Sequence, residues 1–222
     1  MGVLDFLEKN FDQILFLTWE HIFMVGLSLI IGTAIWVPLG ILITKKENLA
    51  KNVINVANVI MTIPSIALFG LMMPILATVG HGLGKVPAIV ALVLYSQLPI
   101  LRNTYVAIKD VPPSIRDAGK GMGMSRWQLL KEVEIPVAAP VIVAGLRTAA
   151  VMNIGIGAIA AYIGAGGLGV YIQQGIDRLF PEMIISGAVL VSLLAILVDV
   201  LMAAVEYLLT PKGIQLEKRL AQ

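Results

Sequence analysis

Residues 111–136 read VPPSIRDAGKGMGMSRWQLLKEVEIP and form a charged insert in a chain that otherwise consists of long apolar stretches. The insert predicts two short helices joined by a tight turn. Gly123 lies between them, where a glycine can adopt the backbone conformation that ends one helix and lets the next leave at an angle. An insert of this kind is typical of a docking element for another protein.

Both predicted helices carry a possible start signal. The first begins after two prolines, with Ser114 and Asp117 at the spacing of a capping pair, and the second begins with Ser125 and Gln128 at the same spacing. Because basic residues are frequent along the insert, the alternative interpretation is an amphipathic segment that lies on anionic lipid.

The rest of the chain has the composition of an integral membrane protein. Hydrophobic residues make up 58% and charged residues 14%, and the mean hydropathy is +0.90, whereas a soluble domain carries roughly 25% charge. A helix needs about 20 mainly apolar residues to cross the hydrocarbon core. We therefore predict a single all-α membrane domain with five transmembrane helices and a cytoplasmic two-helix insert. The five predicted spans are 22–43, 53–79, 86–107, 137–161 and 184–209.

The distribution of Lys and Arg predicts the orientation. Three lie in residues 44–52, six in residues 102–136, and the last three are Lys212, Lys218 and Arg219. The opposite side holds Lys9, Lys85 and Arg178. The positive-inside rule places the N-terminus outside, and the insert and the C-terminus in the cytoplasm of a cell bounded by an inner or plasma membrane. The acidic first 20 residues predict no cleaved leader.

Several classes of function are disfavoured by composition. A net charge of +2 is too small to indicate nucleic acid binding, and the absence of cysteine excludes disulfides and thiolate metal sites. His21 has no second histidine nearby, so we expect it at the membrane interface and expect no metal site.

The insert resembles the cytoplasmic coupling motif of binding-protein-dependent ABC importer permeases. That motif is Glu-Ala-Ala, three residues, Gly, nine residues, and Ile-x-Leu-Pro. Here Asp117-Ala118-Gly119 takes the first place, Gly123 the glycine, and Val133-Glu134-Ile135-Pro136 the end, with every spacing kept. The departures are conservative, although Gly119 in place of Ala weakens the first helix by about 1 kcal/mol.

Nearly the whole chain is similar to one branch of that superfamily, the permeases for glycine betaine, carnitine and choline. The similar segments are 18–21, 37–40, 62–65, 134–140 and 153–169. The resemblance implies the type I ABC importer fold and no catalytic site. It also implies a cytoplasmic ABC ATPase dimer that holds ATP and Mg, an external solute-binding protein, a second permease copy or paralogue, and no cofactor on this chain.

Two alternatives stay open beside this interpretation. Importer permeases for methionine and related amino acids have a similar size and a similar Gly-Gly-Leu-Gly string in an outer loop. A hypothesis from another class is a channel or scaffold that needs no ATPase. The exact solute and the choice between homodimer and heterodimer are not determined by the sequence.

The resemblance also assigns candidate coupling residues. They are Asp117, Ala118, Gly119, Met122, Gly123, Met124, Ser125, Leu129, Ile135 and Pro136. To transmit motion, the insert needs one face that docks and one that is anchored to the membrane helices. We expect these faces to be formed by Ile115, Ala118, Met122, Leu129, Leu130 and Val133. Four basic residues should lie outside them: Arg116, Lys120, Arg126 and Lys131.

Candidates for the pathway or its gate come from breaks and polar groups within the spans. Pro64 and Pro74 each remove a backbone donor from the second span and should bend or break it. Asn153 and Tyr162 are further candidates. Against a gating role, proline and glycine are also common in membrane helices for packing reasons.

Arg147 and Asp199 are the charged residues deepest in the predicted spans. Each lies about ten residues, or about 15 Å, from the cytoplasmic edge, and an unpaired charge at that depth costs at least a few kcal/mol. We predict that they form a buried ion pair. The alternatives are that both line a water-filled pathway or that Arg147 reaches the interface. Glu206, nearer the edge, needs no special role.

Gly164, Gly166, Gly167 and Gly169 fit Gly-x-Gly-x-x-Gly, but they follow an apolar helix rather than a strand, so we expect an outer turn and no nucleotide site. Residues 80–86 lack two positions of a phosphate-binding loop. A quaternary ammonium is usually bound by clustered aromatic rings, and here the aromatic residues are dispersed, as Trp36, Tyr95, Tyr162 and Tyr171 illustrate. High-affinity selection is therefore expected on the external binding protein.

Overall fold

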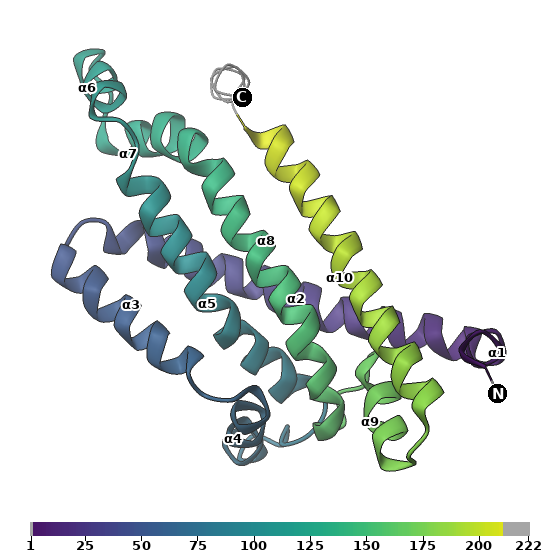
Figure 1. Ribbon diagram of the computed structural model, residues 1–222. Helices are drawn as coiled ribbons and strands as arrows, with labels where there is room; N and C mark the ends of the chain where they lie inside the picture. The colour runs from purple at the N-terminus through teal and green to yellow at the C-terminus, as the bar shows by residue number, and fades with distance from the viewer. Residues whose placement is uncertain (1, 211–222) are drawn as a thin grey trace.

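The computed structural model describes residues 2–210, which are about 85% helical and contain no strand. Figure 1 shows the elements. They are α1 (Val3–Lys9), α2 (Phe11–Ile43), α3 (Glu47–Met61), α4 (Ser65–Ala77), α5 (Lys85–Lys109), α6 (Pro113–Gly121), α7 (Arg126–Gln128), the π-helix η1 (Leu129–Glu134), α8 (Ile135–Ile159), the 3₁₀-helix η2 (Ala160–Ile163), α9 (Gly169–Asp177) and α10 (Pro181–Leu209). Lys212, Lys218 and Arg219, which entered the orientation prediction, lie outside the described residues.

The prediction of an all-helical membrane fold is confirmed. Within residues 2–210, α2, α5, α10 and the helical run Arg126–Ile163 are long and apolar enough to cross a membrane, and α3 with α4 makes a fifth crossing if this bent pair is one span. The helix of the first predicted span is longer than the span, because α2 begins at Phe11 and the predicted span begins at Ile22. Ile14 and Leu17, in the first turns of α2, pack into the main core and stabilise this early part of the helix.

The second predicted span is not a single helix. α3 and α4 meet at an angle of 100°, and Pro64, which has no N–H to donate, is the N-cap of α4. The Tyr95 hydroxyl on α5 donates to the carbonyl of Ile63 at this break. Pro74 was expected to bend or break the helix as well, but α4 continues through it.

The core lies where α2, α5 and α8 pack together. In Figure 1, α5, α8 and α10 run in similar directions and α2 crosses behind them at a steep angle. The hairpin of α6 and α7 lies at one end of the bundle, near the last turns of α10, whereas α1, α4 and α9 lie toward the other end. This arrangement places the insert and the outer glycine turn at opposite ends, as the span prediction requires.

His21, which was expected at the membrane interface, lies inside the protein. Its side chain is fully buried, and Nε2 donates to the carbonyl of Ile154 on α8 at 3.0 Å. Asn153 is also fully buried, and its amide donates to Ser28 Oγ at 3.3 Å and to the carbonyl of Leu92 at 3.2 Å. Both side chains join α2 to α8, so hydrogen bonds as well as apolar packing hold the core.

Candidate coupling site and transport pathway

The turn between α6 and α7 has the geometry that its residues predict. Gly123 has a φ of +79°, which an L-residue with a side chain rarely adopts. Ser125 then caps α7, since its Oγ accepts the Gln128 N–H at 3.3 Å and its own N–H donates to Gln128 Oε1 at 2.9 Å. The start of the second coupling helix was therefore correctly predicted from local sequence.

The start of the first helix differs from the prediction. Pro112 is the N-cap of α6 and no side chain caps this helix, so Ser114 does not act as the predicted cap. Asp117 forms an ion pair with Lys120 instead, at 3.0 Å, and both side chains are exposed. Because proline at the first helical position leaves fewer N–H groups to satisfy, α6 can begin without a side-chain cap.

The second coupling helix does not end before the membrane. It passes through the π-helix Leu129–Glu134 directly into α8, so Pro136 lies in the first turn of a continuing helix. A proline ring collides with the carbonyl four residues earlier, and a wider π-helical turn relieves that collision. The insert is therefore a short helix, α6, folded back on an extension of α8.

A partly buried ion pair holds α6 against this extension. Arg116 was expected on the outer, solvated side, but Nε lies 2.6 Å from Glu134 Oε1, and the two side chains are only 25% and 16% exposed. A second guanidinium nitrogen donates to the carbonyl of Ile108 near the end of α5. Arg116 thus connects α6 to the end of α5 and to the helix that leads into α8. A displacement of α6 would therefore be transmitted to both of these helices.

The apolar residues of the insert divide into an inner and an outer set. Gly119 and Leu129 are buried, and a Cβ on Gly119 would lie 2.6 Å from Leu129 Cδ1, so the glycine permits close packing of the two helices. Met122 is 71% exposed and Trp127 is 69% exposed. These two side chains are the most exposed large apolar groups of the insert, and Ile115 is 38% exposed.

The ten predicted coupling residues therefore have different surroundings. Gly119 and Leu129 are buried, Met124 and Ile135 are half-buried, and the exposed ones are Asp117, Ala118, Met122, Gly123, Ser125 and Pro136. Sequence reasoning missed Trp127.

Arg147 and Asp199 lie together, although they are not buried as expected. Nε and a terminal nitrogen of Arg147 donate to the two carboxylate oxygens of Asp199 at 2.6 and 2.7 Å, and the side chains are 34% and 38% exposed. Glu206, expected to need no role, lies 3.6 Å from Arg147. The three residues line an open hollow of about 650 Å³ between α8 and α10.

The other pathway candidates are scattered. Pro64 is exposed at the break between α3 and α4, and Pro74 is exposed within α4. Tyr162 is 45% exposed in η2, whereas Asn153 is fully buried in the core. The structure does not bring these four residues together at one site.

The outer glycine residues form a turn that is held by α2. Gly164, Gly166 and Gly167 have φ values of +77°, +82° and +79°. A Cβ on Gly169 would lie 1.9 Å from the backbone oxygen of Ala158, so this position also requires glycine.

One carboxylate joins the turn to two helices. Glu20 on α2 accepts the Gly167 N–H at 3.3 Å and lies 2.7 Å from Lys85 Nζ at the start of α5. The turn is thus tied to both helices, and nothing in its backbone arrangement resembles a strand-to-helix nucleotide loop.

Comparison with known proteins identifies the family. The model of the binding-protein-dependent transport system inner membrane component matches residues 36–211, which include the whole insert. The chain belongs to this family. It is therefore the permease subunit of an ABC importer.

Relatives of the permease cover almost its whole length. It is 48% identical to the osmoprotectant import permease protein OsmW of Salmonella typhimurium, over 97% of this chain and 100% of that protein. It is 44% identical to the glycine betaine/carnitine/choline transport system permease protein OpuCB of Bacillus subtilis, over 96% of each chain. Among solved structures, an inward-facing MetNI methionine ABC transporter is similar with a TM-score of 0.79 and 26% identity, over 89% of this chain and 96% of that chain.

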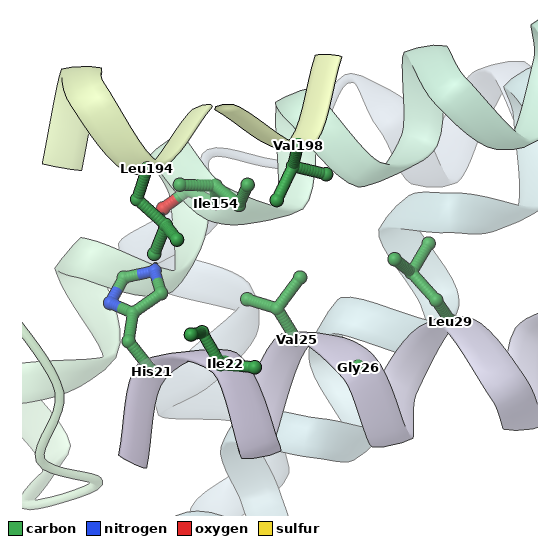
Figure 2. A pocket seen from close by; sticks show the side chains of 8 residues that line it. All are labelled: His21, Ile22, Val25, Gly26, Leu29, Ile154, Leu194 and Val198. Atoms are coloured by element: carbon green, nitrogen blue, oxygen red, sulfur yellow. Dashed lines mark hydrogen bonds between the residues drawn. The ribbon is translucent and has the colours of Figure 1, made fainter. Parts of the chain in front are cut away.

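A partly open pocket between α2, α8 and α10 is too small for a solute. Its volume is about 110 Å³, and every lining side chain except that of His21 is apolar. Figure 2 shows the His21 ring pointing to the carbonyl of Ile154, with Val25 and Leu194 beside it. Since binding pockets for small molecules usually exceed about 300 Å³, we interpret this space as a packing gap between α2, α8 and α10.

Proposed function

We propose that this permease imports quaternary-ammonium compatible solutes, namely glycine betaine, carnitine and choline. The observation that carries the proposal is the 48% identity to an osmoprotectant import permease along essentially the full length of both chains. The rival solute class, methionine and related amino acids, is supported by a structural neighbour at only 26% identity. The osmoprotectant assignment is therefore favoured.

In this proposal, two permease subunits form the pore, two cytoplasmic ATPase subunits bind ATP and Mg²⁺, and an external protein delivers the solute. The permease itself needs no cofactor. The exposed Met122 and Trp127 give the insert an apolar surface that fits a groove on the ATPase. Arg116 and its partners then pass the motion of the ATPase to α5 and α8.

The orientation follows from the insert. With α6 in the cytoplasm, the glycine turn at residues 164–169 faces outward and can meet the binding protein. The N-terminus lies outside and the C-terminus lies inside an inner or plasma membrane.

Reconstitution tests the function directly. Proteoliposomes with permease, ATPase and binding protein should accumulate radiolabelled glycine betaine only when ATP is present, and vesicles with the permease alone should not. Uptake by the permease alone would support a channel. ATP-driven uptake of methionine without uptake of glycine betaine, carnitine or choline would support the rival solute class.

A further inference from the structure

One edge of α3 carries amide side chains that have no hydrogen-bond partner among the described residues. Asn55 and Asn58 are both exposed there. Val56, between them in the sequence, lines the groove between α2, α3 and α5, and the buried Ala57 packs in a cluster with Leu101 of α5. Since successive residues of a helix are about 100° apart, Asn55 and Asn58 lie on the edge of α3 that is turned away from α2.

These two asparagines lie well inside the membrane-spanning bundle. The Lys109 ammonium at the end of α5 lies 3.5 Å from the carboxylate of Glu47 at the start of α3. The hydroxyl of Tyr95, nearer the middle of α5, donates to the carbonyl of Ile63 just after α3 ends. Asn55 is midway between these two contacts along α3, so it is level with a membrane-crossing part of α5.

Arg102 lies at the same level on α5. The charge count placed it in the cytoplasmic segment 102–136, but α5 continues to Lys109, so Arg102 lies about 10 Å before the end of this helix. Its side chain is exposed and makes no hydrogen bond or ion pair within residues 2–210. A guanidinium in this position is costly in lipid, so its surroundings in the assembled transporter must supply water or a partner.

The neighbours of Arg102 define the direction of its side chain. Leu101 packs with buried alanines of α3, Asn103 lies close to α8, and Thr104 lies close to α2. A helix turns by about 100° at each residue, so Arg102 points between α3 and α8 and away from α2. It therefore lies on the same side of the bundle as the two asparagines.

The hollow between α8 and α10 opens on this side as well. The amide of Asn153 turns toward α2, whereas Thr148, on the opposite side of α8, lines the hollow. Arg147, Asp199 and Glu206 line the same hollow. Polar or charged side chains of α3, α5, α8 and α10 thus gather on the side of the bundle away from α2.

The outer side of α2 has the opposite character. Every exposed residue in the segment 22–43 is apolar, which suits contact with lipid. Figure 1 shows α2 crossing behind α5 and α8, so the two sides of the bundle are distinct. Amides and a guanidinium have no water to bond in lipid, so the polar side requires a watery space or a packed protein chain beside it.

We propose that the side of the bundle away from α2 borders the water-filled route of the solute, and that Arg102 binds the carboxylate of a zwitterionic solute as it passes. Asn55 and Asn58 keep the adjoining edge of α3 hydrated. The inference rests on the proposed function and adds the residues that meet the solute within the permease.

The charge of Arg102 discriminates between the proposed solutes. A guanidinium can donate two parallel hydrogen bonds to a carboxylate, which glycine betaine and carnitine carry. Choline has the trimethylammonium group but no carboxylate, so it gains nothing from a cation on its route. A single exposed arginine also gives a weak site, which a solute can leave within one transport cycle.

The absence of cysteine from the chain allows a direct test of the watery space, because one introduced cysteine is the sole thiol of the permease. The complete transporter is placed in lipid nanodiscs, where both membrane faces are open, and treated with a methanethiosulfonate that carries a trimethylammonium group. Mass spectrometry of the permease gives the rate of modification. Asn55→Cys and Asn58→Cys are compared with Val56→Cys, whose native side chain is 60% exposed in the protomer.

We expect both asparagine positions to react at least about tenfold faster than Val56→Cys, because the thiolate is the reacting form and lipid disfavours it. If Val56→Cys reacts as fast as the other two, the polar side is not distinguished by water. If both asparagine positions are unreactive with ATP and without it, protein or lipid covers this edge of α3. Either result would overturn the proposed route.

Uptake by proteoliposomes tests the role of Arg102. We expect Arg102→Gln to slow maximal uptake of glycine betaine about tenfold, the equivalent of one charge-assisted hydrogen bond, and of choline less than about twofold. Arg102→Lys keeps the charge and should lose less. The unfolding temperature should stay unchanged, because Arg102 has no partner among residues 2–210.

Two uptake results would overturn the carboxylate contact. An equal loss for both solutes would mean that Arg102 serves assembly or holds a lipid headgroup, and unchanged uptake of both would mean that the solute does not meet it. If the wild-type complex imports neither solute, the proposed function fails, whereas the cysteine measurement still decides whether this side of the bundle borders water.

Discussion

The ion pair between Arg116 and Glu134 makes the sharpest prediction about coupling. Replacing Arg116 with Met removes the donor that joins α6 to the start of α8 and to the carbonyl of Ile108. Oppositely charged atoms 2.6 Å apart attract by about 6 kcal/mol at an effective dielectric constant of about 20. Most of this attraction is offset by the desolvation of both ions.

We expect Arg116→Met to lower the free energy of unfolding by about 2 kcal/mol. The variant leaves the Glu134 carboxylate and the Ile108 carbonyl without their hydrogen-bond donor, and both groups are mostly shielded from water. Lys120→Met is the matched control one turn later in α6. Its partner Asp117 lies at 3.0 Å, but the two side chains are 63% and 70% exposed, so the expected loss is at most about 0.5 kcal/mol.

Two measurements follow. Thermal unfolding in detergent reports the difference in stability, and proteoliposomes report the ATP hydrolysed for each solute imported. We expect Arg116→Met to unfold at a lower temperature and to hydrolyse more ATP for each solute imported. Lys120→Met should stay close to wild type in both measurements. Glu134→Gln added to Arg116→Met should recover part of the stability. If both single variants lose the same stability and the same coupling, the ion pair does not hold the insert.

Three further predictions concern contacts outside the insert. Tyr95→Phe should lower the free energy of unfolding by about 1 kcal/mol, because the carbonyl at the break between α3 and α4 loses its donor; an unchanged denaturation curve would refute this. Gly169→Ala should cost about 3 kcal/mol, whereas Gly155→Ala, where a Cβ meets nothing within 4 Å, should be neutral or stabilising in the same thermal assay. Arg147→Leu should reduce assembly and transport more than Arg147→Leu combined with Asp199→Leu, since the single change leaves a carboxylate without its partner; equal yields and rates would contradict the pair.

Local signals in the sequence predicted the parts of the structure that depend on neighbouring residues. Hydropathy located the membrane helices, and the spacing of Ser125 and Gln128 located the start of α7. Gly123 was predicted as a turn because glycine alone adopts positive φ at low cost. The start of α2 was missed because the acidic residues before His21 lower the mean hydropathy of this stretch. The apolar face of the helix, with Ile14 and Leu17, nevertheless packs into the core.

The sequence by itself determined that this protein is a helical membrane permease, because composition and motif spacing are properties of the chain alone. From loop charge it also predicts that the insert is cytoplasmic. Only the tertiary structure decided which polar groups meet. It paired Arg116 with Glu134 and buried His21 against Ile154. These outcomes depend on the crossing angles and rotations of packed helices, and a one-dimensional pattern of apolar residues specifies neither closely enough to choose the partner of a single side chain.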